Sequence, residues 1–509
     1  MAVENLDPLA HELVVVRLLA RGPAQFGDAG ALRDVDPDLR DQNSFEIEAR
    51  DHGPTLTEAR RSDKHALPCG LGRLVATVLL LAAFGAACTA GRRGPAPVGP
   101  LRVGTSGDYP PYSAEAGDGA FFGFDVDAAR AYARDRDRPL EFVPFRWPEL
   151  ADRLKRGDFD VAMSGVTVRG DRLARSPMTM PVARTEAVLV VPAGTPRFDL
   201  ARNGAGLRVA VNHGGHMERI ARSMLPAAGI EPVDDNRSLA DLLARGRVDA
   251  VVIDAAELAS FYPDPDGQMP QVAAVLSRDR KAWWVTRGDP ALADDLDAWI
   301  AEREADGTLP ALRTRFGIEP AAAPDARTRV AELVGRRLML MPLVAESKRR
   351  AGRPVEDPER EARVMESYLA GARAAGLDDA RVAVFARAPM EAAKNVQRAV
   401  LAAEAPRRGR AASATEANAP DAGEAASPDL EAGLHPAITR IDGQILAELA
   451  RSAPLGASAL EIAAAIRESA PVPGLERDDV ARMAVALASL PAAAVVPQSP
   501  GVSRPPAEP

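Results

Sequence analysis

The chain has 509 residues and a net charge of -9. Nucleic-acid binding needs clustered positive charge, so this acidic balance argues against a nucleic-acid partner. The length exceeds what one hydrophobic core usually supports, and we expect two or three domains. Both cysteines, Cys69 and Cys88, lie in the first hundred residues. The rest of the chain therefore has no disulfide framework.

The first hundred residues predict an export signal. Residues 1–60 show no sustained periodicity, and we interpret them as disordered or as a wrongly assigned upstream region. Residues 61–88 join a basic flank to the apolar run LVATVLLLAAFGAAC, which is too short to span a bilayer comfortably. The box ending at Cys88 resembles a bacterial lipoprotein cleavage site, so a lipidated Cys88 and ordinary cleavage nearby both stay open. A short buried helix is the alternative. We predict an exported, periplasmic protein, with or without a lipid anchor.

Residues 101–317 alternate strand candidates with helical stretches. Strand-like runs such as LRVGTS and VDAVVID are separated by helical runs such as VDAARAYARD and SLADLLARGR. This alternation predicts an α/β fold with mainly parallel sheets. Two such units follow one another, and we expect the chain to cross between them near Pro192 and again near Val275. A cleft between two lobes is a common place for a small ligand.

The segment VNHGGHMERIAR (211–222) reads as a strand, a glycine turn and a helix. Such a junction presents unpaired backbone N–H groups and the positive end of a helix dipole, which favour an anion. Glu218 falls in the first turn of the helix. It is either a capping residue that compensates the dipole or an acid that faces a ligand.

Several segments of 101–317 carry a resemblance to a known family. They are GDYPPYS, GFDVD, GDFDVAMSGVT, Asp171 with Arg172, and VDAVVIDAAE. In order and spacing they resemble the periplasmic solute-binding proteins of the amino-acid type. The resemblance implies a two-lobed, periplasmic-binding-protein-like fold.

The same resemblance implies roles for single residues. Arg172 would hold the α-carboxylate of the ligand, which suits its planar guanidinium. Ser164 and Thr167 would line the same pocket, together with Trp147. Asp254, at the end of a strand, would hold an α-amino group. Two plainer interpretations stay open: Arg172 as part of a surface ion pair and Asp254 as a helix cap.

One enzyme branch is closer still. The loop NHGGHMERIAR is similar to that of the periplasmic cyclohexadienyl dehydratases, which implies that Glu218 is a general acid. It would protonate the leaving hydroxyl of prephenate or arogenate while CO2 departs. Asn212, Gly215 and His216 of the same loop would contact the substrate. His213 and His216 replace a proline and a threonine of the family, and as a metal site they lack a third ligand. We predict no metal and no cofactor.

The periodicity becomes helical after residue 320. We predict an all-helical domain over 327–401, a flexible linker over 402–428 and further helices over 429–495. Arg337 and Lys348 are eleven residues apart, so one helix would place them on the same side. They form either a solvated basic edge or part of an anion site.

The order R-x10-K-x3-G-x-P-x-E-D-x2-R, which ends in M-E-A-x-K-x-V-Q, resembles the secreted γ-class helical chorismate mutases. The resemblance implies that basic residues clamp the two carboxylates of chorismate, that an amide donates to its ether oxygen and that an aspartate takes its ring hydroxyl. The implied residues are Arg337, Lys348, Arg360, Gln397 and Asp357, with Arg440 as a final arginine. Gln444 is better aligned than Arg440. Ala393 replaces a small polar residue, and we expect Pro389 to break the first turn of a helix.

Together these patterns predict an exported bifunctional enzyme. Chorismate would become prephenate, and prephenate or arogenate would become phenylpyruvate or phenylalanine. These small molecules are the expected partners, and the oligomeric state stays open. The alternative is an amino-acid-binding receptor of a transporter, fused to a degenerate mutase. Glu218 discriminates between the two, because a receptor needs no proton donor there.

Overall fold

The computed structural model describes residues 99–195, 205–258, 270–320, 325–411 and 428–491. From Pro100 onward, these residues belong to one compact unit. The predicted upstream region and export signal, with Cys69 and Cys88, lie outside the described residues. Within the described part, no helix combines the length and the apolar character needed to cross a membrane.

The first lobe is built on a four-stranded sheet in the order β12-β6-β1-β5. β1 pairs in parallel with β5 and β6, and β12 joins β6 in the antiparallel sense. A small three-stranded sheet of β2, β3 and β4 follows β1 in the chain. The strand bounds are β1 Leu101–Thr105, β2 Asp108–Tyr109, β3 Ser113–Glu115, β4 Phe121–Phe122, β5 Leu140–Pro144, β6 Val161–Ala162 and β12 Trp284–Val285.

Helices of the first lobe bury apolar side chains against this sheet. Trp283, Trp299 and Tyr132 are among the largest buried residues and share one core with Leu101 and Val103. The helices are α3 Phe124–Asp135, η3 Trp147–Glu149, α4 Leu150–Arg156, α5 Gly170–Arg175, α9 Pro290–Ala305 and α10 Thr308–Phe316.

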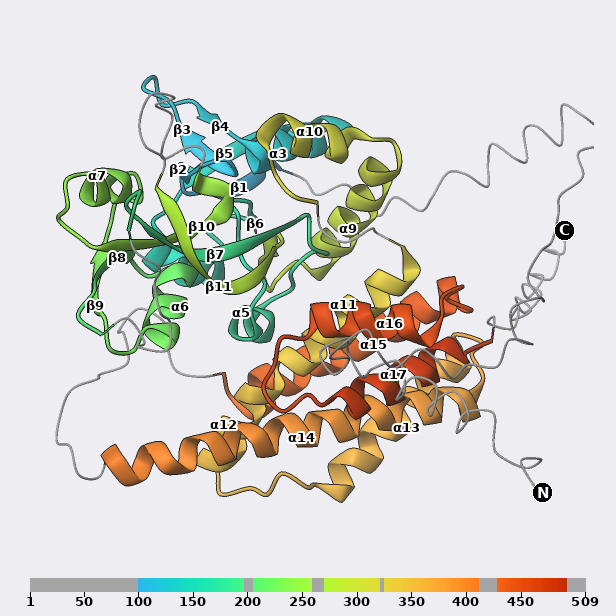
Figure 1. The fold of residues 1–509 in the computed structure, drawn as a ribbon. Coiled ribbons are helices and arrows are strands. Elements are labelled where there is room, and N and C mark those ends of the chain that lie inside the picture. Colours follow the sequence, from blue (N-terminus) through green and yellow to red (C-terminus); the bar gives the residue numbers. More distant parts are fainter. Residues whose placement is uncertain (1–98, 196–204, 259–269, 321–324, 412–427, 492–509) are drawn as a thin grey trace, which may run out of the picture. The chain divides into compact units, whose positions relative to one another are not determined.

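The second lobe holds a five-stranded sheet in the order β11-β7-β10-β8-β9. β8, β9 and β10 run in parallel, whereas β7 is antiparallel to both β10 and β11. The bounds are β7 Ala183–Val191, β8 Arg208–Asn212, α6 His216–Met224, β9 Gly229–Val233, α7 Ser238–Ala244, β10 Ala250–Asp254, η5 Ala255–Glu257 and β11 Gln271–Lys281. Figure 1 shows α6 and α7 beside these strands.

The predicted crossing points are wrong. β7 as a whole belongs to the second sheet, so the chain enters this lobe before Ala183 and leaves it after Lys281, at the end of β11. The prediction near Pro192 and Val275 assigned β7 to the first unit. Strand and helix alternation indicates parallel units, but it does not indicate which sheet an antiparallel strand joins.

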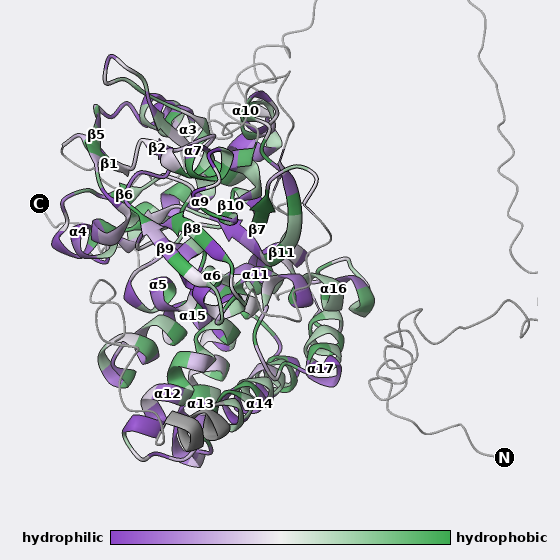
Figure 2. Ribbon diagram, turned by 60° about the vertical axis from the view of Figure 1, so that its left-hand side comes forward, coloured by the Kyte–Doolittle hydropathy of each residue, from purple (hydrophilic) through white to green (hydrophobic). Residues whose placement is uncertain are grey.

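An all-helical part follows, as predicted. Its helices are α11 Ala326–Met339, α12 Met341–Arg350, α13 Pro358–Ala374, α14 Asp379–Ala411, η6 Leu430–Leu434, α15 His435–Ser452, α16 Ala459–Ser469 and α17 Arg477–Ala488. Figure 2 shows these helices banded in hydrophilic and hydrophobic residues, as expected for amphipathic helices that share a core. The fold is therefore an α/β two-lobed domain followed by an all-α domain.

Two helix predictions need correction. The single helix expected to carry Arg337 and Lys348 is divided at Leu340, where Pro342 in the first turn of α12 has no N–H to continue the hydrogen bonds. Pro389, in contrast, lies inside the 33-residue helix α14 and does not break it. This helix also extends to Ala411, so residues 402–411 are helical and not linker.

Candidate functional site

Residues of both lobes line a cleft with about 340 Å³ of empty space, a size within the usual range for small-molecule sites. Six of the predicted substrate-binding residues line it: Trp147, Thr167, Arg172, Asn212, Gly215 and His216. The remaining wall consists of Tyr109, Gly165, Met217, Asn236 and Glu257. The cleft therefore joins the glycine turn before α6 to the loops of the first lobe.

Arg172 lies on α5 and is buried. Its Nη1 donates to the Thr167 carbonyl at 2.9 Å, and its guanidinium carbon lies 5.6 Å from the centre of the Trp284 ring. These contacts fix the plane of the guanidinium at the cleft wall, where a ligand carboxylate could accept from it. The burial excludes the alternative of a surface ion pair.

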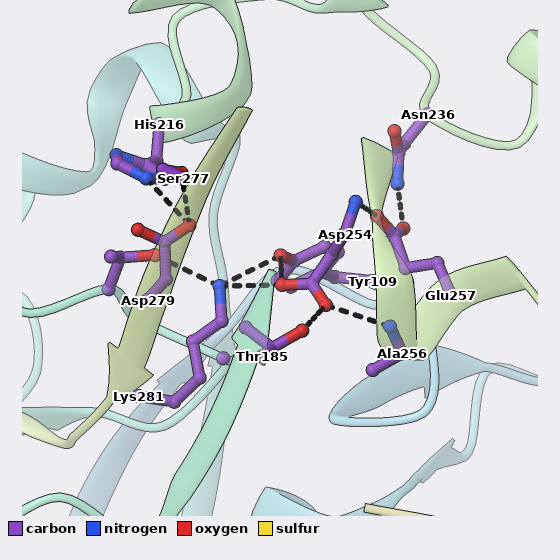
Figure 3. A network of polar contacts seen from close by, with 12 residues as sticks. Tyr109, Thr185, His216, Asn236, Asp254, Ala256, Glu257, Ser277, Asp279 and Lys281 are labelled. Atoms are coloured by element: carbon purple, nitrogen blue, oxygen red, sulfur yellow. Dashed lines mark hydrogen bonds and ion pairs between the residues drawn. The ribbon is translucent and has the colours of Figure 1, made fainter. Parts of the chain in front are cut away.

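Asp254 ends β10 and is fully buried, but it does not line the cleft. Figure 3 shows its carboxylate surrounded by protein donors. Oδ1 accepts from the Thr185 hydroxyl and from Ala256 N, and Oδ2 accepts from the Tyr109 hydroxyl at 2.8 Å and pairs with Lys281 Nζ at 2.9 Å. The cap interpretation of Asp254 is confirmed, because it forms a capping box with Glu257.

Ser164 does not line the cleft. Its buried hydroxyl accepts from Ser106 N at 3.1 Å and lies 2.9 Å from the Ser106 Oγ. The side chain therefore connects two loops of the first lobe. The resemblance predicted that Ser164 lines the pocket, but only its loop neighbours Gly165 and Thr167 do so.

Glu218 is buried in the first turn of α6, beside the cleft residues Gly215 to Met217. Its Oε2 accepts from Gly214 N at 2.7 Å, and its Oε1 accepts from Arg222 Nε and Nη2 at 2.9 and 2.7 Å. These are the contacts of a turn cap and an i,i+4 ion pair. Glu218 is not among the residues that line the cleft.

The two histidines of the loop have separate partners. His216 Nε2 lies 2.9 Å from Asp279 Oδ2, and burial lowers the pKa of this imidazole. His213 Nδ1 lies 2.9 Å from Asp234, on the exposed side. Within the described residues, no three His, Cys, Asp or Glu side chains are placed to hold a metal ion.

Glu257 is a second buried carboxyl, and it lines the cleft directly. Its Oε1 accepts from Asn236 Nδ2, and its Oε2 accepts from Asp254 N at 3.1 Å. Burial, reinforced by the negative charge of Asp254, raises the pKa of Glu257 well above its ordinary value. This carboxyl is thereby kept protonated at a pH where an exposed glutamate is ionised.

A second cavity, with about 670 Å³ of empty space, lies among α11 to α15. Five predicted residues line it: Arg337, Lys348, Asp357, Arg360 and Gln397. Further charged residues at its wall are Arg353, Glu361 and Lys394, beside His435, whose pKa burial lowers. Five lysine and arginine side chains thus face two acidic ones, a balance that favours a dianion.

Two side chains show how this cavity is organised. Arg337 Nε donates to Asp442 at 2.8 Å, and Tyr368 donates to the same oxygen at 2.6 Å, so the guanidinium is held in place from behind. Gln397 is buried, and among the described residues its Oε1 has no hydrogen-bond partner. A buried amide oxygen without a partner is costly, and at the cavity wall this oxygen is left to accept from a ligand, while Nε2 donates only to Met341 Sδ at 3.7 Å.

The prediction that Arg440 is the final arginine of this site is wrong, because Arg440 does not line the cavity. Its Nη2 donates to the Leu173 carbonyl at 3.0 Å. His435 and Ile438 are the α15 residues at the cavity wall, and Arg440 lies two positions beyond Ile438. Two positions correspond to a rotation of about 200° around a helix, which places Arg440 on the opposite side.

Known proteins match both parts of the chain. Residues 101–319 match the family model of bacterial extracellular solute-binding proteins, family 3, and residues 328–398 match chorismate mutase type II. The cyclohexadienyl dehydratase of Pseudomonas aeruginosa is 30% identical over 217 residues, which cover 42% of this chain and 80% of that relative. The chain belongs to the family 3 solute-binding proteins.

Amino-acid-binding proteins also match a similar share of the chain. The L-cystine-binding protein TcyJ of Escherichia coli is 25% identical over 219 residues, 43% of this chain and 82% of that protein. A crystal structure of an ancestral amino acid-binding protein, a precursor of cyclohexadienyl dehydratase, is 29% identical with a TM-score of 0.40, covering 43% of this chain and 95% of that one.

Sequence reasoning missed several cleft residues of this family 3 solute-binding protein. Tyr109 and Glu257 were inside the quoted segments GDYPPYS and VDAVVIDAAE but received no role. Asn236 in the cleft wall and Lys281 behind it carried no signal, because they belong to no segment of the resemblance. Asn236 lies between β9 and α7, and the position of Lys281 follows from how β11 pairs with β7, which only the tertiary structure defines.

Proposed function

We propose that this chain is a bifunctional enzyme. In the helical cavity it rearranges chorismate to prephenate, and in the cleft it converts prephenate to phenylpyruvate or arogenate to phenylalanine. The observation that carries the proposal is that one chain holds two cavities, each with a buried arginine in its wall, Arg172 in the cleft and Arg337 in the helical cavity. The match to a cyclohexadienyl dehydratase and to chorismate mutase type II supports the two reactions.

The mutase step is a unimolecular rearrangement in which a C–O bond breaks as a C–C bond forms. It needs no proton transfer, so the protein has to hold the folded conformer and stabilise negative charge on the ether oxygen. Arg337, Lys348 and Arg360 line the cavity and would bind the two carboxylates. Gln397 can then turn its amide N–H toward the ether oxygen, and Asp357 can accept from the ring hydroxyl.

The dehydratase step breaks two bonds of the ring. The bond to the ring carboxylate breaks, CO2 leaves, and its electron pair forms the aromatic ring while the hydroxyl departs as water. A proton must reach this hydroxyl from an acid. We propose Arg172 as the carboxylate clamp and Glu218 as the acid, from the resemblance and from its place beside the cleft. To act, Glu218 has to exchange its bonds to Gly214 and Arg222 for the substrate hydroxyl.

A receptor for amino acids is the second candidate function. The L-cystine-binding relative favours it, and so do the capping contacts of Glu218. The donors around Asp254 argue against it, because an ammonium group would find no free carboxylate oxygen there.

Turnover decides between the two. The purified full chain is given chorismate, and separately prephenate and arogenate, and loss of chorismate and formation of phenylpyruvate or phenylalanine are followed. The proposal expects both steps to be catalysed. Ligand-induced thermal stabilisation by amino acids without turnover would establish the receptor instead.

We also propose that the chain is exported to the periplasm. The apolar run before Cys88 and the extracellular character in the family name support this. Fractionation of expressing cells would show whether the protein reaches the periplasm. Comparison with a Cys88→Ala variant would show whether a lipid on Cys88 attaches it to the membrane.

A further inference from the structure

We infer that the cleft selects a 2-keto acid and rejects the matching α-amino acid, because Lys281 occupies the carboxylate that would hold an ammonium group. This inference rests on the proposed function, and it chooses prephenate over arogenate as the substrate. The two molecules differ only in the side chain, where prephenate has a keto carbonyl and arogenate has a protonated amine.

The ion pair of Lys281 and Asp254 is the first step. Both residues are buried, Lys281 at 1% and Asp254 at 0% exposed, and their charged atoms are 2.9 Å apart. A carboxylate has about four lone-pair sites. Asp254 fills them with Lys281, Tyr109, Thr185 and the N–H of Ala256 (Figure 3).

The second step is what Lys281 does behind the cleft wall, where it is buried and bonds to two lining residues. Its Nζ also donates to Thr167 Oγ1 at 2.9 Å and to the Tyr109 hydroxyl at 3.0 Å. Thr167 and Tyr109 both line the cleft. Because the Thr167 oxygen accepts from an ammonium, its own O–H is left to donate, and a ligand carbonyl is the matching acceptor.

The third step is the charge that the ligand meets. A second ammonium beside Lys281 would be repelled and would lose water without gaining a carboxylate partner. A keto oxygen is uncharged, so it is not repelled by Lys281 and needs no carboxylate partner to replace its water. Glu257 offers no charged replacement partner, because burial and the nearby charge of Asp254 raise its pKa, and its oxygens already accept from Asn236 and Asp254 N.

Steady-state kinetics of the full chain test the inference. We expect kcat/KM for prephenate to exceed that for arogenate by roughly 100-fold, the scale of one lost charge-assisted hydrogen bond. Lys281→Met should narrow the ratio by about tenfold or more, because it removes the positive charge behind the cleft wall and leaves the negative charge of Asp254 uncompensated. Lys155→Met, on the exposed side of α4, is the matched control and should leave the ratio unchanged. Equal use of both substrates by the wild type would overturn the inference.

Lys281→Met leaves a buried charge without a partner and can impair folding. The double variant Lys281→Met/Asp254→Asn removes both charges. It should fold and still prefer prephenate, because no carboxylate becomes available. A double variant that gains arogenate turnover would contradict the role of Asp254.

Binding separates this inference from the proposed function. Phenylpyruvate and L-phenylalanine share one side chain and differ as keto acid and amino acid. If neither substrate is turned over but calorimetry detects phenylpyruvate and not phenylalanine, the dehydratase fails and the selectivity stands. Binding of phenylalanine alone, or of neither compound by an inactive chain, would overturn both.

Discussion

At the residue scale, two buried glutamates compete for the role of proton donor. Glu218 follows from the resemblance, and its pairing with Arg222 could have been read from the i,i+4 spacing in the sequence. Glu257 could not have been found this way, because its burial beside Asp254 arises from tertiary packing. The residue type and the turn were predictable, whereas the partner of each carboxylate was not.

Glu218→Gln tests the acid directly. If Glu218 delivers the proton, the substitution should lower dehydration by about 100- to 10,000-fold, since an amide cannot release a proton. Mutase turnover should stay intact, because Gln397 and its neighbours lie in the other cavity. Phenylpyruvate absorbance and chorismate loss measure the two steps.

Glu257→Gln is the comparison for that experiment. Dehydration that survives Glu218→Gln and disappears in Glu257→Gln would transfer the acid role to the residue that lines the cleft. Parallel loss of mutase and dehydratase turnover in either variant would contradict separate sites.

The raised pKa of Glu257 also predicts how stability depends on pH. A carboxyl whose pKa is higher in the folded state stabilises the fold fully below its ordinary pKa of about 4.3, and this contribution is lost as the pH rises through the folded-state value. Glu257→Gln cannot titrate, so its melting temperature should fall less than that of the wild type between pH 5 and pH 8. Thermal unfolding across this range measures the difference, and parallel curves would contradict the buried, protonated state.

At the scale of elements, the register of α15 decides which arginine serves the mutase. Arg360 lines the helical cavity and Arg440 does not. Arg360→Gln should therefore raise KM for chorismate about 10- to 100-fold, as expected for a lost charge-assisted contact to a carboxylate. Arg440→Gln is the matched variant and should leave KM near the wild-type value. A large effect of Arg440→Gln alone would restore the prediction made from the sequence.

The glycine turn before α6 gives a second test at this scale. Gly214 and Gly206 both have positive φ, +70° and +80°, but a Cβ on Gly214 would lie 2.7 Å from Pro148 Cγ, while a Cβ on Gly206 would meet nothing within 4 Å. Gly206→Ala should cost about 1–2 kcal/mol of unfolding free energy. Gly214→Ala should cost more and should also reduce dehydration, since Gly214 N binds Glu218. Chemical denaturation and phenylpyruvate assays measure both, and equal costs would show that Pro148 yields easily.

Periodicity predicted the kinds of element well, but it predicted less of how they associate. Alternation identified the α/β part, and the change of period identified the helical part. The sequence could not assign β7 to the second sheet, because antiparallel pairing depends on partners far along the chain. Pro389 was expected to break the first turn of a helix, yet the long α14 accommodates it, and its carbonyl accepts from Arg337 at 3.4 Å.

At the scale of the whole molecule, an acidic chain concentrates basic side chains in its cavities. The net charge is -9, whereas the helical cavity has five lysine and arginine residues at its wall. Net charge alone would argue against dianionic substrates, and local arrangement reverses this conclusion. The match to two family models in one chain fits this organisation: the cleft lies within residues 101–319, and most of the residues that line the helical cavity lie within 328–398.

The bonds around Lys281 bear on how fast the cleft can turn over. Lys281 and Asp254 belong to the second sheet, whereas Tyr109 and Thr167 come from the first lobe. Separation of the lobes has to break the buried Tyr109–Asp254 bond, whereas Lys281 and Thr167 lie on paired backbone segments where the chain crosses between the lobes. Product release therefore depends on the contacts of the same buried Asp254 that disfavour the amine of arogenate. Stronger contacts there would increase the preference for prephenate and would also slow release of the product.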